Sequence, residues 1–321
     1  MSKKTALITG INSQDGIYLS KLLLSKNYRV IGIIRNKNSQ VINFEIIDEN
    51  IELLSWDIFI DNKIEKTLEK YRPNEIYNLA AISSGADMFK NPFEIGYING
   101  LLVVRILEAI VKIDCSIRFF QASSREIFGD AIESPQSELS LKIPRNPYGA
   151  AKLYADNIVK IYRDKYNIFS CSGILYNHES PYRRKEFVSK KITFAAAQIK
   201  LKQATKLYLG NLDSNCDWGF AGDFVEAMWL MLQQNNADDY IIASGNLHSV
   251  REFCSSAFGI LELDYKDYVV IDTVLVRPID NIPLTGNIEK AKKKLKWEPK
   301  TKFNALINLM VRYDLNKSTS K

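Results

Sequence analysis

Histidine and cysteine are scarce in this chain of 321 residues, and their scarcity excludes several kinds of site. The two histidines, His178 and His248, are too few for a histidine-rich metal centre and leave little room for a histidine-based catalytic triad. The four cysteines are scattered and form no Cys-x-x-Cys pair, so structural zinc is not expected. We predict reduced thiols and no metal site.

Long apolar runs are also missing, since no uncharged stretch approaches the ~18 residues of a membrane-spanning helix. The first residues, Met1–Lys4, lead directly into a strand-like segment and show no signal-peptide pattern. The 43 basic and 37 acidic side chains leave a net charge of +6 that is spread along the chain, which favours a solvated surface over a nucleic-acid site. We therefore expect a cytoplasmic globular protein that binds neither membranes nor nucleic acid.

Strand-like and helix-like segments alternate through the first half of the chain. Predicted helices lie between apolar runs that read as buried strands, a pattern typical of a parallel sheet covered on both faces. The predicted strands are Thr5–Ile8, Arg29–Ile34, Ile51–Trp56, Glu75–Ala80, Ile117–Gln121 and Phe169–Leu175. The predicted helices are Gly16–Leu24, Ile64–Tyr71, Leu101–Val111 and Tyr148–Tyr162. The sequence therefore predicts an α/β fold with a doubly wound parallel Rossmann sheet.

The pattern becomes irregular after Leu175, which indicates a second, smaller lobe. A polar run at Asn177–Lys191 precedes shorter elements that include helices at Ile192–Leu201 and Phe303–Tyr313. We predict a dinucleotide-binding domain over residues 1–175, to which a segment near 214–240 returns. Residues 176–321 are expected to form the substrate-binding lobe.

A glycine-containing turn separates the first predicted strand from the first helix. Gly10 and Gly16 allow a tight turn and let backbone N–H groups approach a pyrophosphate at the helix N-terminus. Ser13 stands where the usual Gly-x-x-Gly-x-x-Gly spacing has its middle glycine, and could crowd the phosphates or donate a hydrogen bond to them. An ordinary strand-to-helix turn is the alternative. The candidate cofactor-binding residues of this turn are Gly10, Asn12, Ser13, Gln14, Asp15 and Gly16.

Arg35 follows the second predicted strand, where an NAD-binding fold commonly has a carboxylate for the ribose 2′-hydroxyl. An arginine would instead pair with a 2′-phosphate, so we predict NADP, with a solvated basic loop as the alternative. Further candidates follow the third and fourth strands, because ligands bind at the carboxyl ends of such sheets. They are Asp57, Ile58, Leu79, Ala80, Ala81 and Ser83.

Tyr148 and Lys152 are one turn apart on the same face of a predicted helix. A neighbouring ammonium is expected to lower the pKa of the phenol, which could then take a proton from a substrate hydroxyl while hydride passes to a nicotinamide. Lys152 could also hold the nicotinamide ribose. Ser124, at the end of the fifth strand, could share the hydrogen bond of that hydroxyl. A surface tyrosine–lysine pair is the alternative.

Glu126 adds a carboxylate that simple ketone reduction does not need. Once a sugar C4 hydroxyl becomes a ketone, the C5 proton is acidic, and a carboxylate can remove it while water leaves from C6. The hydride can then return to C6. Arg125 is adjacent, although neighbouring side chains of an extended segment face opposite ways. The alternative for Glu126 is an ordinary loop carboxylate.

Several longer stretches carry a resemblance to a known family over nearly the whole chain. They are Ala6–Gly16, Glu75–Ala81, Phe120–Gly129, Pro147–Tyr154, Gly173–Pro181, Leu207–Asp213 and Ser249–Phe253. The chain resembles the GDP-mannose 4,6-dehydratases, a family of extended short-chain dehydrogenase/reductases. It departs from the family pattern at Ser13, Ile82, Ser84 and Cys216, the last of which stands where the family has an arginine.

The resemblance implies a catalytic set of Ser124, Glu126, Tyr148 and Lys152. It also implies that His178 and Arg183 approach a tightly bound NADP. The implied substrate-binding residues are Ser83, Ser124, Glu126, Asn177, Lys191, Leu209, Gly210 and Arg277.

Self-association as a dimer or tetramer is implied as well, with Leu101–Val111 and Tyr148–Tyr162 as the pairing helices. The apolar stripe of these helices is equally explained by packing on their own sheet.

The reaction that follows from the resemblance is conversion of GDP-mannose to GDP-4-keto-6-deoxymannose. A GDP-heptose 4,6-dehydratase, or a 4-epimerase or C4 reductase, is an alternative on the same scaffold. Glu126 argues against the last two, because neither needs removal of a C5 proton. A catalytically weak nucleotide-binding regulator is the alternative of a different class.

Overall fold

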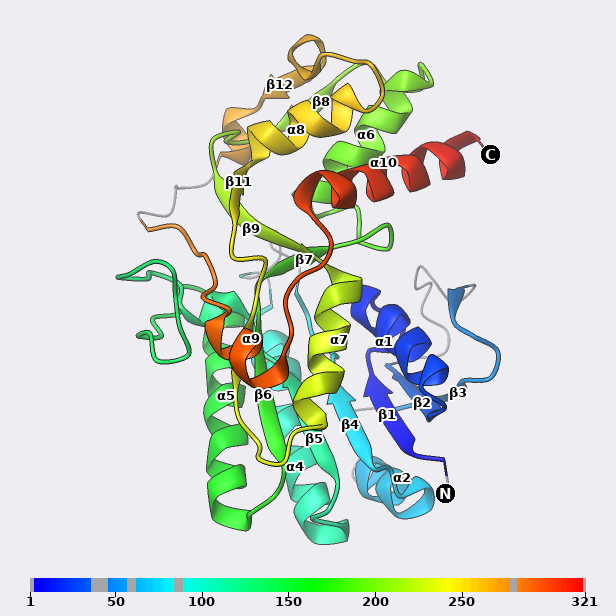
Figure 1. The fold of residues 1–321 in the computed structure, drawn as a ribbon, viewed down its shortest axis with the longest axis vertical. Helices are drawn as coiled ribbons and strands as arrows, with labels where there is room; N and C mark the ends of the chain where they lie inside the picture. The colour runs from blue at the N-terminus through cyan, green and yellow to red at the C-terminus, as the bar shows by residue number, and fades with distance from the viewer. Residues whose placement is uncertain are drawn as a thin grey trace.

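The computed structural model describes residues 3–35, 46–56, 62–83, 89, 91–276 and 282–319 (Figure 1). Its main element is a seven-stranded sheet in the order β10-β6-β5-β4-β1-β2-β3, and every neighbouring pair in it is parallel. The strands are β1 (Thr5–Thr9), β2 (Arg29–Ile34), β3 (Glu52–Ser55), β4 (Glu75–Asn78), β5 (Arg118–Ala122), β6 (Ser170–Leu175) and β10 (Tyr240–Ile242). The strand order reverses between β1 and β4, which opens a crevice at their carboxyl ends.

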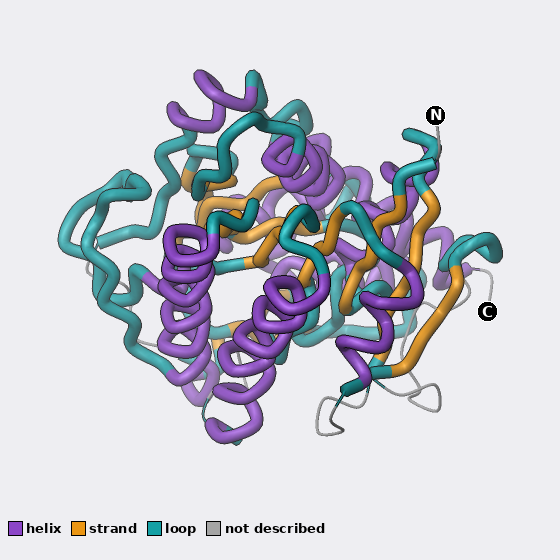
Figure 2. Tube along the Cα trace, turned by 90° about the horizontal axis from the view of Figure 1, so that it is seen from below, coloured by secondary structure: helices purple, strands orange, loops and turns teal. Residues whose placement is uncertain are grey.

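Helices cover both faces of this sheet (Figure 2). The strands alternate in the side chains that they present, so in β1 Ala6 and Ile8 pack into one core while Leu7 packs into the other. One face carries α1 (Gln14–Ser25), α7 (Ala221–Leu232) and α9 (Glu289–Leu295), and the other carries α2 (Lys63–Tyr71), α4 (Leu102–Ile113) and α5 (Pro147–Tyr166). The predicted doubly wound Rossmann fold is therefore confirmed.

A second lobe lies beyond the carboxyl ends of the strands (Figure 1). Its core is formed by α6 (Val188–Lys200), α8 (Val250–Gly259) and α10 (Phe303–Thr319), packed on the parallel pair β8 (Leu207–Leu209) and β12 (Val269–Ile271). A three-stranded sheet of β11 (Leu247–Ser249), β9 (Asn215–Phe220) and β7 (Asn177–Glu179) connects this lobe to the first.

The chain returns to the first domain twice after entering the second lobe. The segment from α7 to β10 places Met228 and Ile242 in the same core as β1, and β10 extends the main sheet beside β6. The later segment 284–297 adds Ile288 and Trp297 to that core, and the Trp297 indole donates to the Asp223 carbonyl at 2.9 Å.

A buried ion pair joins the turn after β1 to β7. The His178 Nε2 atom lies 2.9 Å from Asp15 Oδ2, while its Nδ1 atom lies 2.7 Å from the Tyr176 carbonyl oxygen. Burial disfavours both charged forms, but the pair outweighs it, so the pKa of His178 is raised and the pKa of Asp15 is lowered. The ring also stacks on Phe224 of α7 at 4.6 Å.

We predict that Asp15→Asn destabilises the protein by about 1.5–3 kcal/mol at mildly acidic pH, because His178 loses a charged hydrogen-bond partner. Stability from a raised histidine pKa is complete below the ordinary value of 6.5 and is lost as pH rises through the folded-state value. Stability from the lowered Asp15 pKa is present above 3.8 and is lost in stronger acid. The difference in thermal midpoint between wild type and variant should therefore be largest between pH 3.8 and 6.5.

Thermal unfolding of both proteins from pH 4 to pH 9 measures this difference. Asp213→Asn serves as the control, since Asp213 is an exposed carboxylate paired with Arg251 at 2.9 Å. A midpoint difference for Asp15→Asn that is flat across the range would contradict the ion-pair assignment.

Candidate active site

The turn between β1 and α1 is as tight as a phosphate-binding turn requires. Gly10 has a φ of +67°, and a Cβ atom there would lie 3.0 Å from the Ala80 nitrogen. A Cβ atom on Gly16 would lie 2.4 Å from the Ile11 carbonyl oxygen. The first-turn N–H groups of Gln14 and Asp15 have no preceding helical carbonyl to which they can donate, so they are available to an anion. These features fit the pyrophosphate of a dinucleotide.

The neighbouring end of β4 is held against this turn by Thr9. Its hydroxyl donates to Asn78 Oδ1 at 2.6 Å and accepts from the N–H groups of Leu79 and Ala80, both at 3.1 Å. Leu79 is buried, Ala80 is partly buried and Ala81 is exposed, so the chain emerges here from the sheet into the crevice. Ser83, two residues on, is partly buried.

Ser13 and Gln14 use their side chains within the protein. The Ser13 hydroxyl accepts from the Gly16 N–H at 3.1 Å and so caps α1, which places its oxygen against the helix rather than in the phosphate position. The Gln14 amide donates to the His178 carbonyl oxygen at 3.0 Å and accepts from the Ser180 hydroxyl at 2.7 Å. Gln14 therefore ties the turn to the second lobe, and Asn12 beside them is partly buried.

Arg183 lies near both Asp15, beside the glycine turn, and Tyr148 of α5. Its Nε atom lies 3.0 Å from Glu179 Oε2, and its guanidinium stacks on the Phe187 ring at 3.6 Å. Its positive charge favours the ionised forms of both Asp15 and Tyr148. The structure thus brings the predicted residues Asp15, His178, Arg183 and Tyr148 into one neighbourhood.

The four predicted catalytic residues meet at the carboxyl end of β5. Lys152 is buried within α5 and donates to the Ala122 carbonyl oxygen at 2.7 Å, and its Nζ atom lies 5.7 Å from the centre of the Tyr148 ring. Ser124 begins the short 3₁₀ helix η3 (Arg125–Ile127), where its hydroxyl accepts from the Glu126 N–H at 3.3 Å. The Ser124 hydroxyl also lies near the Tyr148 phenol and favours its ionised form.

The pKa of Tyr148 differs from the sequence expectation. Burial raises it to about 12, with the Glu126 charge adding to the rise and the Ser124 hydroxyl opposing it. Burial also lowers the pKa of Lys152 to about 8, against the opposing charge of Asp156 one turn away. The expected lowering of the phenol pKa is therefore wrong, because burial dominates and the Lys152 ammonium donates to the Ala122 carbonyl oxygen.

Both oxygens of the Glu126 carboxylate face a donor. Asn146 Nδ2 donates to Oε2 at 2.9 Å, and Arg125 Nη2 lies 3.5 Å from Oε1. Arg125 and Glu126 lie side by side because this segment is a 3₁₀ turn, and the reservation about neighbours in an extended segment does not apply. The contact of Asn146 with Glu126 was not anticipated; an asparagine before proline at a helix start was the available signal.

Arg35 lies at the carboxyl end of β2 and is exposed. Its Nη2 atom is 2.5 Å from Glu94 Oε1 in α3 (Pro92–Gly96), and its carbonyl oxygen accepts from Ser55 Oγ at 3.2 Å. Asn91, which caps α3, donates to the other oxygen of Glu94 at 2.9 Å. A ligand phosphate at Arg35 would therefore compete with a carboxylate.

The predicted substrate-binding residues of the second lobe are less concentrated. Asn177 is partly buried at the start of β7 and pairs in register with Trp218, and Lys191 is exposed in the first turn of α6. Leu209 is buried in the core of the lobe, so its side chain packs there. A Cβ atom on Gly210 would lie 2.3 Å from the Leu275 carbonyl oxygen, so this glycine permits close packing after β8.

Some predictions fall outside the described residues. They are those for Asp57, Ile58 and Arg277, together with the departure at Ser84. Asn99 was not predicted, yet its amide clamps the segment before Ser83 by accepting from the Ile82 N–H at 2.9 Å and donating to the Ile82 carbonyl at 3.0 Å. Across the described ranges, no group of three or more histidine, cysteine or acidic side chains could hold a metal ion. None of the helices in those ranges is both long and apolar enough to cross a membrane.

The family model and the sequence relatives that match this chain carry the same description. The family model described as GDP-mannose 4,6 dehydratase matches residues 7–310. GDP-mannose 4,6 dehydratase 2 of Arabidopsis thaliana is 43% identical over 326 residues, with 98% of this chain and 87% of the relative covered. GDP-mannose 4,6 dehydratase of Dictyostelium discoideum is 42% identical over 342 residues, with 98% and 96% covered.

Solved structures share the fold at lower sequence identity. UDP-glucose 4-epimerase of Thermotoga maritima with UDP-glucose gives a TM-score of 0.87 at 21% identity, covering 99% of this chain and 100% of that one. dTDP-glucose 4,6-dehydratase of Bacillus anthracis in complex with NAD gives 0.84 at 20% identity, covering 98% of each chain. RMD of Pseudomonas aeruginosa complexed with NADPH gives 0.81 at 19% identity, covering 98% of this chain and 100% of that one.

The family match spans nearly the whole length, and both relatives exceed 40% identity over 98% of the chain. The chain therefore belongs to the GDP-mannose 4,6-dehydratase family.

Proposed function

We propose that this protein is a nucleotide-sugar 4,6-dehydratase that converts GDP-mannose to GDP-4-keto-6-deoxymannose. The observation that carries the proposal is the Glu126 carboxylate, which is held beside the Ser124, Tyr148 and Lys152 group at the end of β5. A reductase or epimerase would need the last three residues but not a separate base for C5. The family of the relatives supports the same activity.

Tyr148, as the phenolate, takes the proton of the C4 hydroxyl while C4 is oxidised. Ser124 lies near the phenol, favours its ionised form and can hold the same substrate oxygen. The buried ammonium of Lys152, 5.7 Å from the centre of the ring, offsets the negative charge of the phenolate before it accepts the proton. NADP, when bound, supplies the hydride acceptor at C4 and the hydride donor at C6.

Glu126 then removes the C5 proton, which the C4 ketone has made acidic. The electron pair of the C5–H bond forms the C5–C6 double bond, and the C6 hydroxyl leaves with a proton as water. Glu126 is suited to this step because a neutral amide and a nearby guanidinium hold its two oxygens without protonating them. A single carboxylate can both accept the C5 proton and donate one to the leaving group. When hydride is returned to C6, Tyr148 can give the proton that it took from the C4 hydroxyl to C5, which restores the phenolate and leaves the C4 ketone in place.

We predict that Glu126→Gln abolishes loss of water from GDP-mannose while leaving the fold intact. Glutamine keeps the size and hydrogen-bonding reach of the side chain but cannot accept the C5 proton, so product formation should fall by roughly 10²–10⁴-fold. Mass spectrometry of the nucleotide-sugar measures the loss of one water. Glu186→Gln, an exposed carboxylate outside the site, is the matched control. Wild-type protein that removes no water from any GDP-sugar would contradict the proposed activity.

We propose NADP as the cofactor, with Arg35 as the residue that recognises its 2′-phosphate. The tight turn at Gly10 and Gly16 supports a dinucleotide, and Arg35 stands at the strand end where the adenosine ribose is bound in such sheets. Glu94 forms an ion pair with Arg35 in this structure, and a 2′-phosphate would displace this carboxylate.

Substitutions at these two positions should separate NADP from NAD. Arg35→Ser should weaken NADP binding by roughly tenfold to a hundredfold, because a charge-assisted hydrogen bond is lost, and should leave NAD binding nearly unchanged. Glu94→Gln should strengthen NADP binding alone, since the competing charge is removed. Calorimetric titration with both dinucleotides measures these affinities. Equal changes for NAD and NADP in either variant would refute recognition of the phosphate by Arg35.

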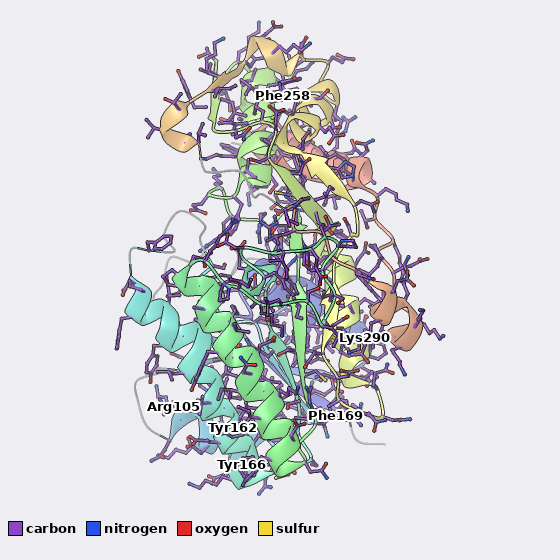
Figure 3. The ribbon with its side chains drawn as sticks, turned by 90° about the vertical axis from the view of Figure 1, so that its left-hand side faces the viewer. Arg105, Tyr162, Tyr166, Phe169, Phe258 and Lys290 are labelled. Atoms are coloured by element: carbon purple, nitrogen blue, oxygen red, sulfur yellow. The ribbon has the colours of Figure 1, made fainter. Side chains whose placement is uncertain are left out.

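We also propose that two copies associate through α4 and α5. These helices lie side by side on the face that is turned to the viewer in Figure 3, where Arg105, Tyr162 and Tyr166 are labelled. Apolar side chains in or next to these helices remain exposed, with Leu101, just before α4, at 46% and Ile161 of α5 at 54%. Pairing the same surface on two copies would cover them.

Ile161→Asp should therefore dissociate the dimer, since a charge would be buried at its centre. Sedimentation velocity across a concentration series measures the mass. Lys21→Asp on α1, which covers the opposite face of the sheet, is the control and should leave the mass unchanged. A wild-type protein that stays monomeric at high concentration would disprove this assembly.

We place the protein in the cytoplasm. All four cysteines lie in the described part of the chain and none forms a disulfide. Thiols of this kind persist in a reducing compartment.

A further inference from the structure

Asn146 is the residue before α5, and its side chain makes two hydrogen bonds in different directions. Its Oδ1 atom accepts from the Gly149 N–H at 2.7 Å, which caps the helix, and its Nδ2 atom donates to Glu126 Oε2 at 2.9 Å. The orientation of the amide follows from the partners, because a carboxylate can only accept and a backbone N–H can only donate. One side chain thus joins a helix end to a carboxylate.

The parts that Asn146 connects have little room to move relative to each other. A Cβ atom on Gly149 would lie 2.4 Å from the Glu126 carbonyl oxygen, so the first turn of α5 packs directly on η3. Tyr148 is two residues beyond Asn146, and Lys152 one turn further on. The amide therefore sets the Glu126 carboxylate in a fixed relation to the phenol and the ammonium.

We propose that Asn146 is a positioning residue for elimination, which holds the Glu126 carboxylate toward the sugar C5 while it caps the helix that carries Tyr148 and Lys152. The inference rests on the proposed role of Glu126 as the base. Asn146 touches neither the reacting atoms nor the cofactor in this scheme, and it acts through Glu126 alone. A neutral donor suits the task because it orients the carboxylate without supplying it with a proton.

The residue type also follows from the two tasks. Serine, aspartate and asparagine are all good N-caps, so capping alone does not require an amide. Serine is too short to bridge to a carboxylate that asparagine reaches at 2.9 Å. Aspartate has no N–H to donate and would place a second negative charge beside Glu126. Among these caps only asparagine offers an acceptor for the helix and a donor for the base.

The test compares Asn146→Asp and Asn146→Ser, which keep the cap and remove the donor, with wild type. Both variants should retain the thermal midpoint, while water loss from GDP-mannose falls by roughly tenfold to a hundredfold because the base is no longer held in place. The reduced nicotinamide, seen by its near-ultraviolet absorbance after mixing with GDP-mannose, should accumulate in the variants, since C4 oxidation continues and elimination lags. In Asn146→Asp the acid limb of the pH–rate profile should also move to higher pH, which a purely structural role would not cause.

Each outcome decides the proposal. Water loss and pH profile equal to wild type in both variants would overturn it while leaving the proposed function intact. An equal fall in C4 oxidation and in water loss, with a lowered thermal midpoint, would also overturn it, because Asn146 would then be only a structural cap. If Asn146→Asp fails to fold, Asn146→Ser carries the same comparison without the added charge. Wild-type protein that removes no water from GDP-mannose would refute the proposed function itself, and the inference with it.

Discussion

The geometry of the site depends on one buried hydrogen bond, from the Lys152 ammonium to the Ala122 carbonyl oxygen at the end of β5. A buried ammonium needs a partner, and a strand carbonyl at the sheet edge supplies it without neutralising the charge. The bond holds α5 in a fixed position relative to the carboxyl end of β5. Because Ser124 and Glu126 come shortly after Ala122 in the chain, the same bond constrains their distance from Tyr148. The proposed catalytic group is therefore positioned by the contact between one helix and one strand.

Charges in the crevice are compensated in pairs rather than left to solvent. Asp15 lies in the first turn of α1, close to where a pyrophosphate would be bound, and its charge would oppose an anion there. His178 and Arg183 offset that charge. Hydrogen bonds between the two lobes, including those of Gln14, offset the unfavourable free energy of burying these charged groups. The charge of Asp15, beside the proposed pyrophosphate position, is consequently stabilised by His178 and Arg183, which follow β6 in the chain.

The sequence predicted the parallel sheet, and it placed Tyr148 and Lys152 on one helix, because these signals are local. The strands are continuous apolar runs, and Tyr148 and Lys152 lie one helical turn apart on the same helix. The short strands β7, β9 and β11 were not predicted, since none of them is a continuous apolar run and they form by pairing with one another. The segment Asn177–Lys191 was described only as a polar run, although it contains β7 and the start of α6.

Contacts between segments that are far apart in the sequence could not be predicted from local sequence patterns either. Glu94 is 59 positions from Arg35 in the chain, and nothing in either segment indicates that they pair. Asn146 and Glu126 are 20 positions apart, and their contact depends on how η3 packs on α5. The raised pKa of Tyr148 likewise follows from burial, which a residue spacing does not reveal.

The return of the chain to the first domain has a consequence for biosynthesis. A ribosome releases residues in order, and the first domain acquires its edge strand β10 only after α6, β8 and β9 have emerged. Its last core contributions, Ile288 and Trp297, come later still. Until β10 is synthesised, one side of β6 in the nascent Rossmann domain has no strand with which to pair. We therefore expect the two lobes to complete their folding together, near the end of translation.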